Sequence, residues 1–250
     1  MRNLLFACCF ILSTTAFARI SENANNDSIS AIEKKDKSTV DLKASNFSFG
    51  VSLNPAISWL NIEHDDLQTD GATINGGVGI IAEYSVNRLI SLVSGLNFNM
   101  PGGYTYDNAS MNDISTKNNY LIQLYTLELP LTVKFKTLPS DNIVYYTQGG
   151  VGAGYRIGSK ELHRAGGSQY SDKKSSFNSY SNPFLLNYTV GLGASYNTGK
   201  KYRIFGEINY KSSLTDIAST DGYTLSGRYL TTPTPEIFSG NMVFSVGVMF

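Results

Sequence analysis

The chain has little cysteine and little histidine, and it lacks both long basic runs and long apolar runs. Its two cysteines, Cys8 and Cys9, lie in an N-terminal secretory signal, so the secreted form has no thiol for disulfides, catalysis or metal binding. The formal net charge is zero, which argues against a nucleic-acid partner. After the signal, no segment approaches the roughly 18 consecutive apolar residues of a membrane helix.

The N-terminal segment has the composition of a signal peptide over residues 1–18. A basic start and an apolar stretch over residues 4–12 precede the cleavage site Ala16-Phe17-Ala18. A lipoprotein signal ending at Cys8 is the alternative, but most of the apolar stretch follows that cysteine instead of preceding it. Residues 19–45 are polar and poor in aromatics, which predicts a flexible periplasmic leader.

From Asn46 to Phe250 the sequence alternates between apolar and polar residues, as β-strands do. Eight segments are predicted strands: 47–60, 75–86, 89–102, 120–136, 144–158, 184–197, 201–214 and 239–250.

The connections between these strands alternate in length. Four long loops (61–74, 103–119, 159–183 and 213–238) alternate with three short turns (87–88, 139–142 and 198–200). A soluble sandwich does not need to sort its loops in this way. The pattern predicts an all-β fold, an eight-stranded antiparallel up-and-down transmembrane β-barrel of small size over residues 46–250. The long loops would lie outside the cell, and both termini in the periplasm.

The last strand shows the two faces of such a barrel. Met242, Phe244, Val246, Val248 and Phe250 share one face, whereas Ser245 and Gly247 lie on the other. An unbroken apolar face is expected where a closing strand contacts lipid.

Charged residues fall on the opposite face of the strands from the apolar residues. Placing them in hydrocarbon would cost several kcal/mol each, so they are expected inside the barrel. We expect an internal salt-bridge network that seals the barrel, in preference to a proton or ion path. Its predicted members are Glu83, Glu128, Lys134, Arg203, Glu207 and Lys211.

Aromatic residues recur eight to ten positions apart on the outward faces, which predicts two girdles at the edges of an apolar band roughly 20–25 Å tall. The predicted pairs are Tyr125/Phe135, Tyr145/Tyr155, Tyr188/Tyr196 and Tyr202/Tyr210, with Trp59 in the outer girdle and Phe250 in the periplasmic one.

Two residue types are expected to shape the interior. Pro130 lies in the middle of a strand, where it loses a ladder hydrogen bond, so a β-bulge is expected there. Inward glycines such as Gly193 are expected to make room for bulky neighbours such as Tyr146.

Signals for catalysis are weak. His64 and His163 fall in different predicted loops, and the aspartates at positions 65, 66 and 70 do not match the spacing of a calcium loop. No serine lies in a nucleophile-elbow context. We expect no catalytic residues, no metal and no cofactor.

Residues 125–135, Tyr-Thr-Leu-Glu-Leu-Pro-Leu-Thr-Val-Lys-Phe, resemble the Y-x-E-I-P-L-L-x-K strand of the Bacteroidota outer-membrane β-barrel family that includes PorT-like proteins. Residues 149–155, Gly-Gly-Val-Gly-Ala-Gly-Tyr, are similar to the next, glycine-rich strand of that family. Phe250 is similar to the terminal residue by which such barrels are handed to their insertion machinery. The resemblance implies a barrel and leaves the activity open.

The sequence therefore predicts a small integral outer-membrane protein with a structural or accessory role in the envelope and no catalysis. One alternative is a PorT-like component supporting type IX protein secretion, and another is a surface-binding or adhesion protein acting through its long loops. The expected partners are outer-membrane lipid and lipopolysaccharide, the barrel insertion machinery, and secretion-system or envelope proteins.

Overall fold

The structure is a computed structural model that describes residues 46–63, 67–107, 118–165, 171–172, 182–199, 201–217, 224–225, 228–229 and 236–250. The predicted signal peptide and periplasmic leader lie outside these residues. In the described part of the chain no helix is long and apolar enough to cross a membrane.

Ten longer strands form the main sheet: β1 (Phe47–Leu53), β2 (Ala56–Glu63), β5 (Gly77–Ser85), β6 (Ile90–Asn99), β7 (Gly102–Asp107), β8 (Asn118–Lys136), β9 (Ile143–Ala165), β11 (Phe184–Asn197), β12 (Arg203–Ser213) and β15 (Glu236–Met249). Shorter strands join them or pair separately: β3 (Leu67–Gly71), β4 (Thr73–Asn75), β10 (Ser171–Asp172), β13 (Thr224–Leu225) and β14 (Arg228–Tyr229).

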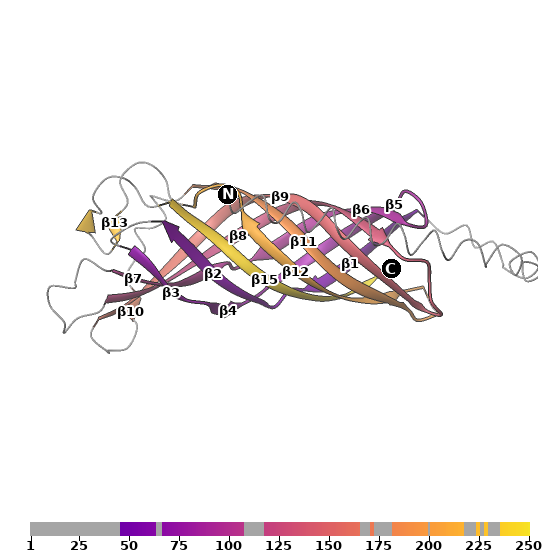
Figure 1. The fold of residues 1–250 in the computed structure, drawn as a ribbon, viewed down its shortest axis with the longest axis horizontal. Helices are drawn as coiled ribbons and strands as arrows, with labels where there is room; N and C mark the ends of the chain where they lie inside the picture. Colours follow the sequence, from indigo (N-terminus) through magenta and orange to yellow (C-terminus); the bar gives the residue numbers. More distant parts are fainter. Residues whose placement is uncertain are drawn as a thin grey trace, which may run out of the picture. The chain divides into compact units, whose positions relative to one another are not determined.

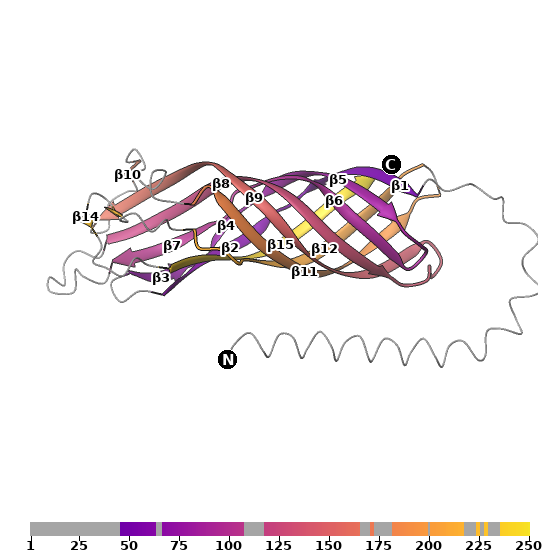
Figure 2. The same cartoon turned by 90° about the horizontal axis from the view of Figure 1, so that it is seen from above.

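The strands close into a ring in which each strand pairs with its neighbours along the chain. The order is β1-β5-β6-β8-β9-β11-β12-β15, and β15 returns to pair with β1, always antiparallel. The strands run obliquely around the barrel in both views (Figures 1 and 2). The predicted eight-stranded antiparallel barrel is confirmed, because β2 continues β1 and β7 continues β6 within this ring.

The first predicted strand, 47–60, is interrupted at Asn54-Pro55. Both halves pair with β15 in one continuous register, from Leu53 opposite Val246 to Ala56 opposite Val243. The break therefore reflects the missing N–H of Pro55, while the direction of the strand is kept.

The predicted long loops begin too early, and this part of the prediction is wrong. β2, β3 and β4 occupy much of 61–74, β7 reaches Asp107, and β9 continues to Ala165. In this outer part of the barrel, away from the short turns, apolar residues face the interior and polar residues occur on the outside. Tyr120 and Ile122 are buried inside, whereas Gln123 lies half-exposed outside. The prediction relied on strands with an apolar outer face and a polar inner face. Strands with an apolar inner face and a mixed outer face do not show that pattern, so they were assigned to loops.

The bulge predicted at Pro130 is also wrong. Pro130 lies opposite Gly152 in an uninterrupted register, and the Ser94 hydroxyl donates to the Pro130 carbonyl at 2.8 Å. The register shift between β8 and β9 lies instead at Tyr125/Thr126, where Ile157 is the extra residue. A missing N–H removes one ladder bond but does not require an inserted residue.

Candidate functional site

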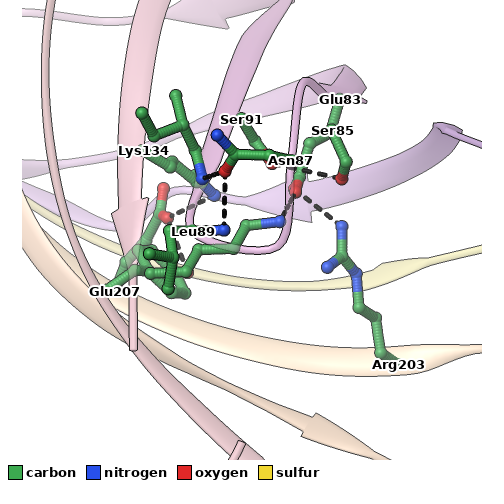
Figure 3. Close-up of polar contacts among 11 residues, drawn as sticks. Glu83, Ser85, Asn87, Leu89, Ser91, Lys134, Arg203 and Glu207 are labelled. Carbon is green, nitrogen blue, oxygen red and sulfur yellow. Dashed lines mark hydrogen bonds and ion pairs between the residues drawn. The ribbon is translucent and has the colours of Figure 1, made fainter. Parts of the chain in front are cut away.

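The barrel interior holds a cluster of charges at the end where the short turns lie. Arg203 on β12 places Nη2 2.7 Å from Oε2 of Glu83 on β5, and Lys136 on β8 pairs with Oε1 of the same carboxylate. Figure 3 shows the Arg203 guanidinium directed at the Glu83 carboxylate. Since the Glu83 side chain is only 4% exposed, two cations neutralise one buried anion. Lys136 was not predicted, although it shares the inward parity of Lys134.

Another ion pair joins β8 to β12. Lys134 Nζ lies 3.3 Å from Glu207 Oε2, and the Tyr146 hydroxyl donates to the same oxygen at 3.0 Å. The Lys134 ammonium also lies 4.4 Å from the centre of the Tyr146 ring, a cation–π contact. A Cβ on Gly193 would lie 2.7 Å from this ring, so the glycine gives Tyr146 its room.

One more ion pair lies further from the turns. Lys211 Nζ is 2.7 Å from Glu128 Oε1, while the side-chain amides of Asn187 and Asn99 donate to Oε2 at 3.1 and 3.4 Å. The Glu128 side chain is 3% exposed, and both of its oxygens have partners. The structure thus places all six predicted network residues inside the barrel and in ion pairs.

On the side of these ion pairs that lies away from the short turns, the interior becomes apolar. Seven buried residues from β2, β8, β11, the segment after β12, and β15 pack together here: Leu60, Tyr120, Ile122, Leu124, Leu185, Ile217 and Ile237. The barrel is narrow at this height, because a Cβ on Gly103 would lie 2.8 Å from the Leu60 backbone nitrogen. This apolar layer was missed, although the inward parity of β8 continues through Tyr120, Ile122 and Leu124.

The space left inside is small. A polar cavity of about 80 Å³ lies between the ion pairs and is lined by residues such as Asn97, Glu128, Gln148 and Asn209. A smaller cavity of about 30 Å³ adjoins it on the side of the apolar layer. These volumes hold a few water molecules and no larger solute. Among the described residues, the ion pairs and the apolar cluster therefore take up much of the interior.

The predicted girdle residues all lie on outward faces. Tyr188 and Tyr210 have ring centres 6.0 Å apart, and Trp59 lies 6.3 Å from Tyr210, so three strands contribute to one aromatic patch. Two other outer residues pair with aromatics that were not predicted, Tyr125 with Phe98 at 6.4 Å and Tyr155 with Phe184 at 5.3 Å. At the turn end, Tyr202 is half-buried, and four girdle residues are exposed: Phe135, Tyr145, Tyr196 and Phe250.

The residues considered for metal binding or catalysis are only partly described. His64, Asp65 and Asp66 lie outside the described residues, and of His163 only the backbone, in β9, is described. No group of three or more His, Cys, Asp or Glu side chains capable of holding a metal occurs in the described ranges. The absence of catalysis stays a prediction.

Several solved outer-membrane proteins are similar to this chain at low sequence identity. Neisserial surface protein A matches with 14% identity and a TM-score of 0.43, covering 82% of this chain and 98% of its own. Ail, the attachment invasion locus protein of Yersinia pestis, matches with 13% identity and a TM-score of 0.36, covering 82% and 99%. The outer membrane protease OmpT from Escherichia coli matches with 11% identity and a TM-score of 0.46, covering 85% and 98%.

No curated protein matches the chain. The profile of a protein family, however, matches residues 23–219, which include seven of the eight ring strands. That family is described as the outer membrane protein beta-barrel domain. A match over this much of the chain, together with the closed antiparallel ring, decides the assignment: the chain belongs to the outer membrane protein beta-barrel domain family.

Proposed function

We propose that the protein is a non-catalytic integral barrel with a structural or accessory role in the envelope, a sealed anchor that holds its loop end at the cell surface. The observation that carries this proposal is the filled interior. Three sets of buried ion pairs and an apolar layer occupy the lumen, and a polar cavity of about 80 Å³ lies among the ion pairs.

The energetics of the ion pairs favour a permanent seal over a gate. Separating a buried pair so that one partner stays uncompensated costs about 3–5 kcal/mol, and a path through this lumen would separate several pairs. Outer-membrane lipid and lipopolysaccharide would surround the barrel, and the insertion machinery would deliver it. The turn end and both termini would then face the periplasm.

The test is ion conductance across planar lipid bilayers containing the purified full chain. Folding is checked first by the heat-dependent mobility shift of outer-membrane barrels on gels. We expect the conductance of the membrane to stay at its baseline value when the folded protein is present. A general porin at the same protein-to-lipid ratio should raise it. Stable single-channel steps from the folded protein would contradict the sealed anchor.

A role in surface binding is the second candidate, and one feature favours it. β8 and β9 run for 19 and 23 residues and stay paired as far as Asn118 opposite Ala165. Such a long arm, to which β7 and β10 are also paired, would carry the connection between its two strands away from the membrane. Replacing residues 166–181 with a short Gly-Ser linker should abolish binding to surface glycans or envelope proteins while the heat shift is retained. Unchanged binding would exclude this arm as the contact.

A PorT-like role in type IX protein secretion rests on the sequence resemblance alone. Extraction in mild detergent tests it, because a secretion component should co-purify with stoichiometric partners. Recovery of a lone, heat-modifiable barrel would argue against it and in favour of the self-contained anchor.

A further inference from the structure

The outward face of one barrel wall is hollowed. A groove of about 740 Å³ lies across β12, β15, β1, β5, β6 and β8, and its lining is almost entirely apolar. Two rows of cross-strand neighbours form its rims. One row is Ile204, Val248, Val51, Ile80 and Leu96, and the other is Val246, Leu53, Val78, Phe98 and Leu127.

The floor of the groove is a third row that lies between these two. Gly247, Ser52 and Gly79 are cross-strand neighbours, and their inward side is in tight contact with the interior. A Cβ on Gly79 would overlap the Asn97 side chain, and one on Gly247 would lie 2.5 Å from the Phe205 ring. Two of the three residues in this row are glycines, so little side-chain volume lies between this part of the wall and the interior contents, and the row forms the floor of the groove.

The dimensions of the groove match one hydrocarbon chain. Five strands at a spacing of about 4.8 Å give each row a length of roughly 19 Å, and the rows lie two residues, or about 6.7 Å, apart. A single acyl chain spans half of a hydrocarbon core of roughly 30 Å, which is about 15 Å. The rims are lipid-facing side chains such as Val51, 54% exposed, and Val246, 52% exposed.

A basic residue precedes one end of the groove in the sequence. Ile204 stands at the start of β12, and the exposed Lys201 precedes it in the turn. An ammonium at the edge of the apolar band is placed to attract the phosphate of a lipid whose chain enters the groove at this end.

From this geometry we propose that the groove is a binding site for one acyl chain of a membrane phospholipid, held more tightly than the lipid around the rest of the barrel. The protein would then carry a bound lipid in addition to anchoring its loops. The occupant is a hydrocarbon chain because the lining of the groove is almost entirely apolar, with Ser52 as its one polar residue.

The first test counts the phospholipids retained by the folded full chain during stepwise delipidation, using native mass spectrometry. Val51→Phe places a ring in the groove, and Val151→Phe on β9 is the matched control, since Val151 is also 54% exposed but lies outside the groove. We expect the parent protein and Val151→Phe to retain one phospholipid, and Val51→Phe to lose it.

The second test compares a tryptophan reporter in the groove with one on the lipid-facing surface outside the groove. In a Trp59→Phe background, Phe98→Trp reports on the groove, and Phe184→Trp reports on the lipid-facing surface elsewhere. Phospholipid with brominated acyl chains is titrated into the delipidated barrel in detergent. Quenching at position 98 should saturate near one lipid per barrel, at a concentration at least fivefold lower than at position 184.

Three results would overturn the proposal. They are equal lipid retention by all three proteins, equal quenching at the two reporters, and a lipid-free species with the mass of two barrels, which would assign the groove to a second copy. If Val51→Phe lacks the heat shift, Val246→Phe replaces it, and the reporter comparison decides independently of either variant.

Discussion

Replacing Glu83 with glutamine is expected to destabilise the barrel strongly, because it removes the anion shared by two buried cations. The glutamine has nearly the same shape, so no cavity forms and the effect isolates the charge. At an effective dielectric constant near 20, each unit-charge attraction is about 4 kcal/mol at 4 Å. Arg203, 22% exposed, can recover part of its hydration, whereas Lys136, 10% exposed, cannot easily do so. The expected loss in free energy of unfolding is therefore about 3–5 kcal/mol.

The assay is equilibrium unfolding by urea from lipid vesicles, followed by Trp59 emission and by the heat shift. At a urea m-value of about 2–3 kcal/mol per molar, the midpoint should fall by roughly 1–2.5 M. Arg203→Met should cost less, since Glu83 then keeps Lys136. Glu236→Gln, at an exposed carboxylate on β15, should change stability by less than about 0.5 kcal/mol. Equal midpoints for Glu83→Gln and Glu236→Gln would refute the reasoning.

Two further predictions use the same urea assay. Gly103→Ala should cost about 1–3 kcal/mol, because the new methyl group meets the Leu60 backbone nitrogen at 2.8 Å, whereas Gly206→Ala, with open space around it, should be neutral. Ile122→Ala should cost about 2–5 kcal/mol by leaving a cavity in the apolar layer. Leu129→Ala should cost less than half as much, because Leu129 is 59% exposed on the lipid-facing side. A smaller loss at Ile122 than at Leu129 would mean that the apolar layer is loosely packed.

Much of the barrel could be predicted because lipid imposes a simple rule on the strands that contact it. An apolar exterior and a charged interior alternate with period two, so the parity of Leu129 and Leu131 fixes that of Glu128 and Lys134. Lys136 follows the same rule and could have been included.

The outer part of the barrel was not predicted correctly, because its interior is apolar instead of charged. Tyr120, Ile122 and Leu124 keep the inward parity of β8 but are apolar, so they were not recognised as part of the interior. The bulge at Tyr125/Thr126 also changes the inward parity of β9, which places Glu161 inside. The extra residue, Ile157, lies directly before Gly158, but β9 contains several other glycines, so this glycine does not by itself indicate a bulge.

The identity of each ion-pair partner also lies beyond sequence reasoning. Lys211 and Arg203 share a strand and a parity, yet the first pairs with Glu128 and the second with Glu83. The choice depends on the stagger between strands when the ring closes, and alternation along one strand carries no information about that stagger.

The ion pairs have a consequence for how the barrel enters the membrane. Lys134 and Glu207 are 73 residues apart in the chain, and Glu128 and Lys211 are 83 apart. No hairpin of neighbouring strands contains both members of either pair, so a hairpin entering hydrocarbon alone would carry uncompensated charges at a cost of several kcal/mol each. Insertion and ring closure must therefore be coupled, with the charges entering the bilayer only as the strands that neutralise them come together.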